Sequence, residues 1–285
     1  MLQQPWPLTP TVRRVEARGK TLVFGERTLV MGILNVTPDS FSDGGRYNRL
    51  DAAVRRAVEM VEEGADVIDI GGESTRPGAV PVSLEEELER VIPVVERVAR
   101  EVDVPISVDT YKAEVARQAL EAGAHLINDV WGLKADPDMA RVAAEYGAPI
   151  ILMHNRRDPN YRDLMADIVA DLRESIALAR AAGIPDARII LDPGIGFAKT
   201  YEQNVEVMRR LDAIVALGYP VLLGTSRKSL IGLTLDLPVN ERLEGTIATA
   251  VLGIVQGVDM VRVHDVKAHV RACRMADAIV RGRRA

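Results

Sequence analysis

The stretch MGILNVTPDSFSDGG occupies residues 31–45 and changes character halfway along. The apolar run TLVMGIL (28–34), which leads into it, is typical of a strand buried on both faces. Seven further short runs of the same kind follow: ADVIDI (65–70), PISVD (105–109), HLIND (125–129), APIILM (148–153), RIILD (188–192), PVLLG (220–224) and DMVRV (259–263). These runs are rich in β-branched residues and do not alternate with polar ones, which predicts parallel strands.

Helical patterns lie between these runs, at 50–65, 83–102, 110–124, 136–148, 165–184, 203–218, 242–258 and 266–282. The second begins with Ser83 and Glu86, which predicts a capping box, and it contains Pro93, which predicts a kink. Before the first strand, VEARGKTLVFG (15–25) alternates around a Gly-Lys turn and predicts a β-hairpin.

Eight strand-helix units with no second domain left over predict an α/β fold. We expect a (β/α)8 TIM barrel with an N-terminal β-hairpin, in which residues 1–285 form one domain. An open, doubly wound sheet is the competing fold.

Composition limits the partners of this chain. A hydrophobic content of 47% provides for a large core, and a net charge of −5 argues against a nucleic-acid partner. No apolar run approaches the ~18 residues that a membrane helix needs, and the N-terminus does not have the pattern of a signal peptide. The single cysteine, Cys273, cannot form an internal disulfide. We therefore expect a cytoplasmic protein that binds neither membrane nor nucleic acid.

Polar side chains follow the last apolar residue of every predicted strand. In chain order they are Asn35, residues 71–76, Asp109, Asn128 with Asp129, His154 with Asn155, Asp192, residues 225–228, and Arg262 with His264. The carboxyl ends of barrel strands converge on one mouth, where such enzymes place their chemistry. The pattern predicts an active site there.

The residue types at this mouth indicate what it binds. Asp109, Asn128 and Asp192 suit a neutral heterocycle with several N–H donors along one edge, such as a pterin or guanine ring. Cationic side chains, Arg262 among them, suit an anionic group such as phosphate. Asn35 is a candidate oxygen ligand for Mg²⁺ that bridges phosphates.

Each of these residues also has a purely structural interpretation. Asp109 is placed to cap the helix that follows it, and Asp192 begins an ordinary Asp-Pro-Gly turn. His264 has the alternative of a satisfied surface histidine, and we interpret His125 and His269 in that way.

Two long segments rich in small and polar residues, 35–46 and 71–82, follow the first two strands. Loops of this length are uncommon unless they are functional. Phe41, one of only three phenylalanines, lies in the first segment. We therefore expect this segment to act as a lid that excludes water from a bound substrate.

Seven motifs in order make the sequence resemble the dihydropteroate synthase family. They are MGILNVTPDSFSDGG (31–45), DIGGESTRPGA (69–79), SVDTYK (107–112), INDVWG (127–132), DPGIGFAK (192–199), GTSRKS (224–229) and VRVHDV (261–266). The resemblance implies a (β/α)8 barrel with two mobile loops, usually a homodimer. It also implies a transferase that joins p-aminobenzoate to 7,8-dihydropterin-6-ylmethyl diphosphate, releases diphosphate and makes 7,8-dihydropteroate for folate synthesis. Sulfonamides mimic the second substrate of that family.

The resemblance also implies a role for each matching residue. The pterin would be held by Asp109, Asn128, Asp192, Lys228 and Arg262, the last stacking on its ring. The diphosphate would be held by Asn35, Thr75, Arg76, Arg262 and His264, with Mg²⁺ on Asn35. The p-aminobenzoate site would be lined by Phe41, Pro77, Phe197, Lys228 and Ser229. The implied catalytic residues are Asp43, which would stabilise a developing cation, with Lys228, Arg262 and His264.

The implied chemistry needs no enzyme nucleophile, because the amine of p-aminobenzoate is itself one. This agrees with a sequence in which no Ser/His/Asp or Cys/His pairing is visible. Two other functions share a pterin-holding barrel: a methyltransferase from methyltetrahydrofolate to a corrinoid, and a non-catalytic pterin-binding protein. The GTSRKS and VRVHDV motifs and a loop large enough for diphosphate argue against the methyltransferase. The full length of both loops argues against the binding protein.

Overall fold

The computed structural model describes residues 11–37, 46–74 and 80–282. Its β-strands are β1 (Arg13–Ala17), β2 (Lys20–Phe24), β3 (Leu29–Asn35), β4 (Val67–Gly71), β5 (Ile106–Asp109), β6 (Leu126–Asp129), β7 (Ile150–Met153), β8 (Ile189–Asp192), β9 (Leu222–Leu223) and β10 (Met260–Val263). Its α-helices are α1 (Arg46–Glu62), α2 (Leu84–Glu101), α3 (Ala113–Ala122), α4 (Met139–Glu145), α5 (Leu164–Ala181), α6 (Tyr201–Arg209), α7 (Leu211–Val215), α8 (Ser229–Leu235), α9 (Leu243–Val255) and α10 (Val266–Val280).

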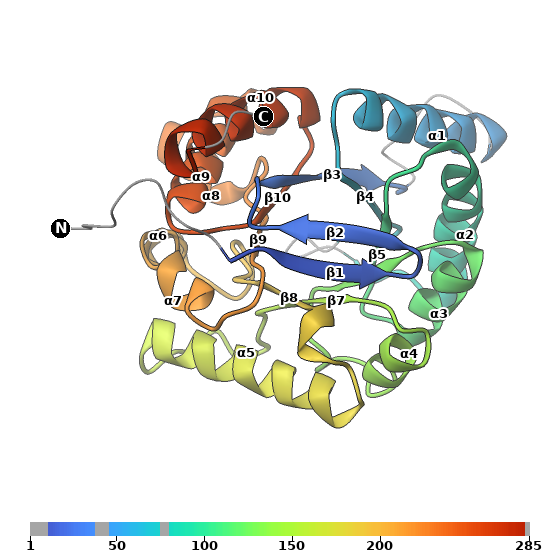
Figure 1. Ribbon diagram of the computed structural model, residues 1–285, viewed down its shortest axis with the longest axis horizontal. Coiled ribbons are helices and arrows are strands. Elements are labelled where there is room, and N and C mark those ends of the chain that lie inside the picture. Colours follow the sequence, from blue (N-terminus) through green and yellow to red (C-terminus); the bar gives the residue numbers. More distant parts are fainter. Residues whose placement is uncertain (1–10, 38–45, 75–79, 283–285) are drawn as a thin grey trace.

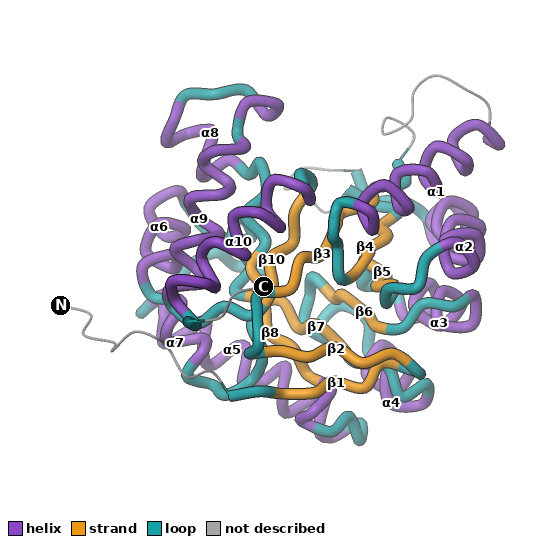
Figure 2. Tube along the Cα trace, turned by 45° about the horizontal axis from the view of Figure 1, so that its top comes forward, coloured by secondary structure: helices purple, strands orange, loops and turns teal. Residues whose placement is uncertain are grey.

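The predicted barrel is confirmed. β3 to β10 form an eight-stranded sheet in the order β8-β7-β6-β5-β4-β3-β10-β9, with parallel pairing throughout. A parallel bridge between Leu191 and Val221 joins the two ends of this order, so the sheet closes on itself. The helices surround the strands as an outer ring (Figure 2). The open doubly wound sheet is therefore excluded.

The predicted hairpin is confirmed and begins two residues earlier than expected. β1 and β2 pair antiparallel, from Arg13 opposite Phe24 to Ala17 opposite Lys20. Figure 1 shows the hairpin lying across one end of the barrel. Its buried face, Val15, Leu22 and Phe24, joins one apolar cluster with side chains near the start of the barrel strands, so the hairpin closes the amino-terminal end of the barrel.

Most differences from the expected helices are local. The helix expected over 203–218 is two helices, α6 and α7, which meet at Arg210. The capping box predicted at Ser83 is only half formed: the Ser83 hydroxyl accepts from the Glu86 N–H, but the Glu86 carboxylate pairs with Arg90. A complete capping box stands instead at Thr200 and Gln203, where none was predicted.

Helix α2 runs on past Pro93, which lies in its interior. Within the described residues, no helix is both long enough and apolar enough to span a bilayer.

The interior of the barrel is layered. Val67, Leu126, Ile190 and Met260 belong to the apolar cluster that the hairpin covers. Side chains two residues apart on a strand share a face. The next residues on that face, nearer the carboxyl ends, are therefore Asp69, Asn128, Asp192 and Arg262. Two residues further along these strands, the interior of the barrel therefore changes from an apolar layer to a layer of charged and polar side chains.

Candidate active site

An ion-pair cluster occupies the polar layer of the barrel. Arg262 on β10 donates from Nε to Asp69 Oδ2 at 2.6 Å and from Nη2 to Asp109 Oδ2 at 2.8 Å. Asn128 on β6 donates from Nδ2 to the same Asp69 oxygen at 3.1 Å. Three predicted residues, Asp109, Asn128 and Arg262, are thus brought together, and Asp69 lies at their centre.

Several polar groups in and beside this cluster have an oxygen without a hydrogen-bond partner in the described part of the chain. Within the described residues, four buried oxygens here have no hydrogen-bond partner: Asp69 Oδ1, Ser107 Oγ, Asp109 Oδ1 and Asn128 Oδ1. A buried polar atom without a partner costs free energy, and such atoms in a cleft are typical of groups that a ligand satisfies. The mouth therefore presents acceptors to a ligand that carries several donors.

Burial sets the protonation of these groups. Burial raises the pKa of Asp109 to about 7, with Arg262 opposing the shift and Asp69 adding to it. Asp69 and Asp109 share the single guanidinium of Arg262, so ionising both carboxylates costs free energy. Burial disfavours the charge of Arg262, but Asp69 and Asp109 together raise its pKa. Arg262 is therefore a permanent cation at physiological pH.

Asp192 and Lys228 are two further charged residues of the mouth, and each affects the pKa of the other. Asp192 Oδ1 accepts from the Gly194 N–H at 2.7 Å, which is the turn contact expected of an Asp-Pro-Gly sequence. Burial raises the pKa of Asp192, and Lys228 opposes that shift. Lys228 donates to the Ile195 carbonyl at 2.6 Å and stands 4.8 Å from the centre of the Phe197 ring. Burial lowers the pKa of Lys228 to about 8.

The remaining predicted residues in the described part of the chain lie around this centre. Asn35 ends β3, and within those residues its carboxamide makes no hydrogen bond. Ser229 is exposed at the first turn of α8. His264 lies just beyond β10, where its Nδ1 is 2.8 Å from the Ser226 hydroxyl. Five further predicted residues, Phe41, Asp43, Thr75, Arg76 and Pro77, lie outside the described residues.

Asp109 and the two histidines, His125 and His269, differ in the role that they take in the structure. Asp109 does not cap α3, whose N-cap is Lys112, because its carboxylate is bound to Arg262. His125 is structural: its Nδ1 accepts from the Ile106 N–H at 3.0 Å, and burial lowers its pKa to about 4. His269 is not a surface residue as predicted. It is fully buried and bonds the Asp265 carbonyl through Nδ1 alone.

Sequence reasoning missed two members of the site. Asp69 is hidden inside the apolar run ADVIDI, and Ser107 inside PISVD. The available signal is spacing: Asp69 stands two residues before Gly71, and Ser107 two before Asp109, so each shares a face with the mouth. A charged residue in the middle of a buried strand is rare unless it is paired.

A further cluster fixes the base of the segment after β4. Lys112 donates to Glu73 at 2.7 Å, to Glu87 at 2.5 Å and to the Val82 carbonyl at 2.7 Å. Glu73 in turn accepts from the Val82 N–H at 3.2 Å and from the Tyr111 hydroxyl at 2.8 Å. Both ends of the stretch from 73 to 82 are thereby held against the start of α3.

The fold is a closed parallel barrel, and the carboxyl ends of its strands carry hydrogen-bond acceptors and cations. This arrangement is typical of a TIM-barrel enzyme. Its acceptors suit a heterocycle with several N–H donors, and its cations suit an anionic substituent on that heterocycle. Comparison with known proteins gives the particular family. The family model described as pterin binding enzyme matches residues 31–264. The chain therefore belongs to the pterin-binding enzymes, and its relatives among them are dihydropteroate synthases.

These relatives match over almost their whole length. The dihydropteroate synthase of Clostridium beijerinckii is 60% identical over 92% of this chain and 98% of its own. The Clostridium difficile enzyme, solved in the presence of pteroic acid, is 56% identical with a TM-score of 0.88, over 90% of this chain and 97% of that one. The Xanthomonas albilineans enzyme, solved with 4-aminobenzoic acid, is 46% identical with a TM-score of 0.90, over 94% and 98%.

Proposed function

We infer that this chain is a transferase that condenses 7,8-dihydropterin-6-ylmethyl diphosphate with p-aminobenzoate, giving 7,8-dihydropteroate and diphosphate for folate synthesis. The single observation that carries this inference is the group of unpartnered buried oxygens on Asp69, Ser107, Asp109 and Asn128 beside Arg262. A pterin presents amino and ring N–H donors along one edge, and carboxylates bind such an edge through parallel hydrogen bonds.

In this proposal the barrel holds the pterin. Asp109, Asn128 and Asp192 accept hydrogen bonds from the N–H groups of the pterin. Arg262 and Lys228 contact its ring. Arg262 is fixed by two carboxylates, so its guanidinium has little freedom and its plane is preorganised for stacking. The whole chain acts as one pterin-binding barrel domain.

We propose that Asn35, Arg262 and His264 bind the diphosphate, and that Thr75 and Arg76, outside the described residues, take part as well. Departure of diphosphate leaves positive charge at the exocyclic methylene of the pterin. Cations at the phosphate end stabilise the leaving group, and Asp43 would stabilise the developing cation. The reaction thus relies on positioning and electrostatics, without a covalent enzyme intermediate.

The donor set at the mouth fits Mg²⁺ that arrives with the diphosphate. Mg²⁺ in phosphate-transfer sites takes one or two protein oxygens and completes its coordination with phosphates and water. Asn35 offers one such oxygen, and within the described residues no group of three or more His, Cys, Asp or Glu is placed to hold a metal. When bound, the ion would neutralise charge on the departing diphosphate.

The aromatic amine is proposed to enter beside Phe197, Lys228 and Ser229, and we propose Phe41 and Pro77, outside the described residues, as further residues that bind it. The amine attacks the methylene and then loses a proton. Compounds that imitate p-aminobenzoate, sulfonamides among them, are expected to compete at this pocket.

Two further proposals concern the cellular compartment and the oligomeric state of the enzyme. The buried free thiol of Cys273 agrees with a reducing cytoplasm. We also propose a homodimer, supported by exposed apolar side chains on the adjoining helices α9 and α10, namely Leu252, Met275 and Ile279. Sedimentation velocity over a range of concentrations tests the dimer, and a monomer at micromolar concentration contradicts it.

The function is tested by incubating the purified chain with both substrates and Mg²⁺. We expect diphosphate and dihydropteroate to appear in equal amounts. The corrinoid methyltransferase alternative predicts methyl transfer from methyltetrahydrofolate instead, and the binding-protein alternative predicts pterin binding without diphosphate release. Either result refutes the proposal.

A further inference from the structure

The turn between β8 and α6, residues 192–199, forms one wall of the proposed site. It begins with Asp192, its Ile195 carbonyl holds the ammonium of Lys228, and its Phe197 ring lies beside the same ammonium. The positions of three proposed binding residues, Asp192, Phe197 and Lys228, therefore depend on how this one turn is folded.

The conformation of this turn needs support from outside it. Gly194, Gly196 and Ala198 all have positive φ, of 70°, 85° and 49°. The left-handed region is unfavourable for a residue that has a Cβ, as Ala198 does. Such a turn keeps a single shape only where surrounding contacts hold it.

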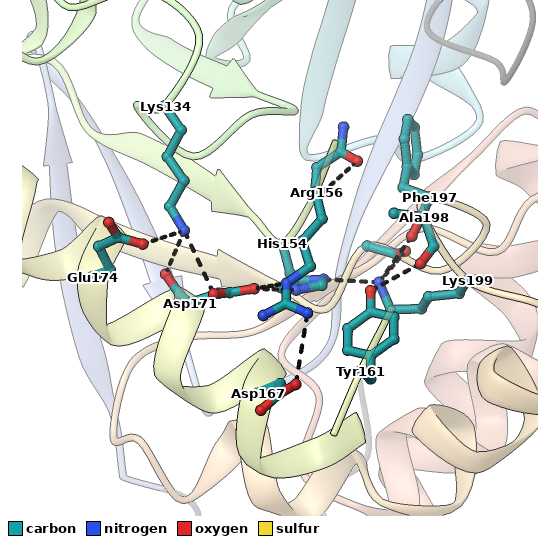
Figure 3. A network of polar contacts seen from close by, with 12 residues as sticks. Lys134, His154, Arg156, Tyr161, Asp167, Asp171, Glu174, Phe197, Ala198 and Lys199 are labelled. Atoms are coloured by element: carbon teal, nitrogen blue, oxygen red, sulfur yellow. Dashed lines mark hydrogen bonds and ion pairs between the residues drawn. The ribbon is translucent and has the colours of Figure 1, made fainter. Parts of the chain in front are cut away.

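Lys199 supplies the central contacts. Its ammonium donates to the Gly194 carbonyl at 3.0 Å and to the Phe197 carbonyl at 3.1 Å, and so ties the beginning of the turn to its end. The third contact is to His154 Nδ1, at 2.9 Å. All three ammonium donors are thus used, as Figure 3 shows.

His154 links this contact to the outer helix ring. Its Nε2 is 3.0 Å from Asp171 Oδ2 on α5, and Arg156 Nε donates to the same oxygen at 2.6 Å. Burial, with the charge of Lys199, lowers the pKa of His154 to about 3, so the ring is neutral. Its Nδ1 then accepts from Lys199 while Nε2–H donates to Asp171, and one tautomer serves both contacts.

Two smaller contacts complete the support of the turn. The Tyr161 hydroxyl donates to the Ala198 carbonyl at 2.8 Å, and the Gly196 N–H donates to Asn204 Oδ1 at 2.7 Å. Each of the three residues with positive φ therefore has a backbone atom that is hydrogen-bonded to a side chain. The partners are Lys199 for Gly194, Asn204 for Gly196 and Tyr161 for Ala198.

We propose that Lys199 is a positioning residue for the condensation: through the carbonyls of Gly194 and Phe197 it fixes the turn that presents Phe197 and Lys228 to the aromatic amine. Lys199 acts through the turn and is distinct from the residues that contact substrate. The inference rests on the proposed function, since it concerns the second substrate of that reaction. Burial lowers the pKa of the Lys199 ammonium to about 7, and the charge of Asp192 opposes this shift.

The test is the steady-state kinetics of Lys199→Met, which keeps the length of the side chain and removes its donors. We expect the KM for p-aminobenzoate to rise about 10-fold, the scale of one lost hydrogen bond to a charged group. The KM for the pterin diphosphate should change less. Lys134→Met is the matched control, because Lys134 binds Asp171 and Glu174 in the same network but is not bonded to the turn. It should leave both KM values unchanged.

A double-mutant cycle separates positioning from general destabilisation. If Lys199 acts by placing Phe197, the effects of Lys199→Met and Phe197→Ala on the KM for p-aminobenzoate are not additive. A lowered melting temperature with a wild-type KM, or fully additive effects, overturns the inference.

A milder variant covers the case in which Lys199→Met does not fold. Tyr161→Phe removes only the contact to Ala198 and should raise the same KM about 3-fold, since a neutral hydrogen bond contributes less. If Lys199→Met does not fold, a wild-type KM in Tyr161→Phe overturns the inference. Absence of turnover in the wild-type chain, by contrast, would refute the proposed function itself.

Discussion

Arg262 Nε lies 2.6 Å from Asp69 Oδ2, so the last strand of the barrel is bonded at its centre to the second. The Asp69 side chain is fully buried, and that of Arg262 is 18% exposed. A buried cation that loses one partner keeps its desolvation cost and loses part of the compensating attraction. Loss of this contact should therefore both lower the free energy of unfolding of the barrel and disturb the position of Arg262 at its mouth.

The first prediction concerns Asp69→Asn. We expect this variant to lose about 2 kcal/mol of unfolding free energy, somewhat less than a fully broken buried pair because Asp109 still holds Arg262. We also expect kcat/KM for the pterin diphosphate to fall at least about 10-fold. Urea denaturation and initial rates measure the two effects. Asp103→Asn, which removes an exposed acid paired with Lys20, is the control and should leave both unchanged.

The second prediction is a pH dependence. Asp109 has its pKa raised to about 7, mainly by burial, so it is protonated below pH 7 and ionised above. The ionised carboxylate is the acceptor that the pterin needs, and kcat/KM should therefore rise with pH through about 7. Removing the charge of Asp69 also removes a like charge that raises this pKa, so in Asp69→Asn the rise should move to lower pH. A rise that stays at the same pH contradicts the assignment to Asp109.

The same shift has a consequence for stability. The pKa of Asp109 is higher in the folded chain than in the unfolded one, so between pH 4 and 7 the folded state holds more protons at this site. Its contribution is complete below about pH 4 and is lost as the pH rises through about 7. Replacing Asp109 with Asn should remove this part of the pH dependence of unfolding.

A third prediction concerns Gly194→Ala. Gly194 has φ of +70°, and an added Cβ would collide with the His154 carbonyl oxygen. We expect a loss of about 3 kcal/mol or more, as for a strained and overpacked site, together with a higher KM for p-aminobenzoate. Gly183→Ala is the matched control. Its φ is +90°, but nothing lies within 4 Å of the added atom, so only about 1 kcal/mol should be lost.

A fourth prediction concerns the metal. Chelation of Mg²⁺ should abolish diphosphate release and leave the unfolding midpoint of the free chain unchanged. Asn35→Ala should raise the Mg²⁺ concentration needed for half-maximal rate, because the one protein oxygen proposed for the ion is lost. Asn48→Ala, which changes an exposed amide on α1, should have no effect. An unchanged Mg²⁺ requirement in Asn35→Ala would show that the ion is held elsewhere.

The architecture was predictable because its signals are local. Eight apolar runs and the polar residue at the end of each run specify both the barrel and its mouth, and Asp109, Asn128 and Arg262 do meet there. Asp69 was missed because a residue inside an apolar run reads as part of a strand. Its partner Arg262 is 193 residues away in the chain. Pairing at that distance has no local signature.

Caps and network partners were the least predictable features. Ser83 and Glu86 have the spacing of a capping box, but Arg90 competes for the Glu86 carboxylate one turn further along the helix. The contact between Lys199 and His154 depends on the relative placement of β7 and the turn after β8, which only the closed barrel fixes.

The hairpin over the floor of the barrel has a consequence for synthesis. Val15, Leu22 and Phe24 leave the ribosome before every strand of the barrel, yet the surface that covers them includes Met260 on the last of those strands. Throughout translation this early apolar face has no complete docking surface, and it waits in the nascent chain until the last strand emerges. A chain stalled before residue 260 should accordingly bind chaperones through its first two strands and stay sensitive to protease until translation resumes and the last strand is made.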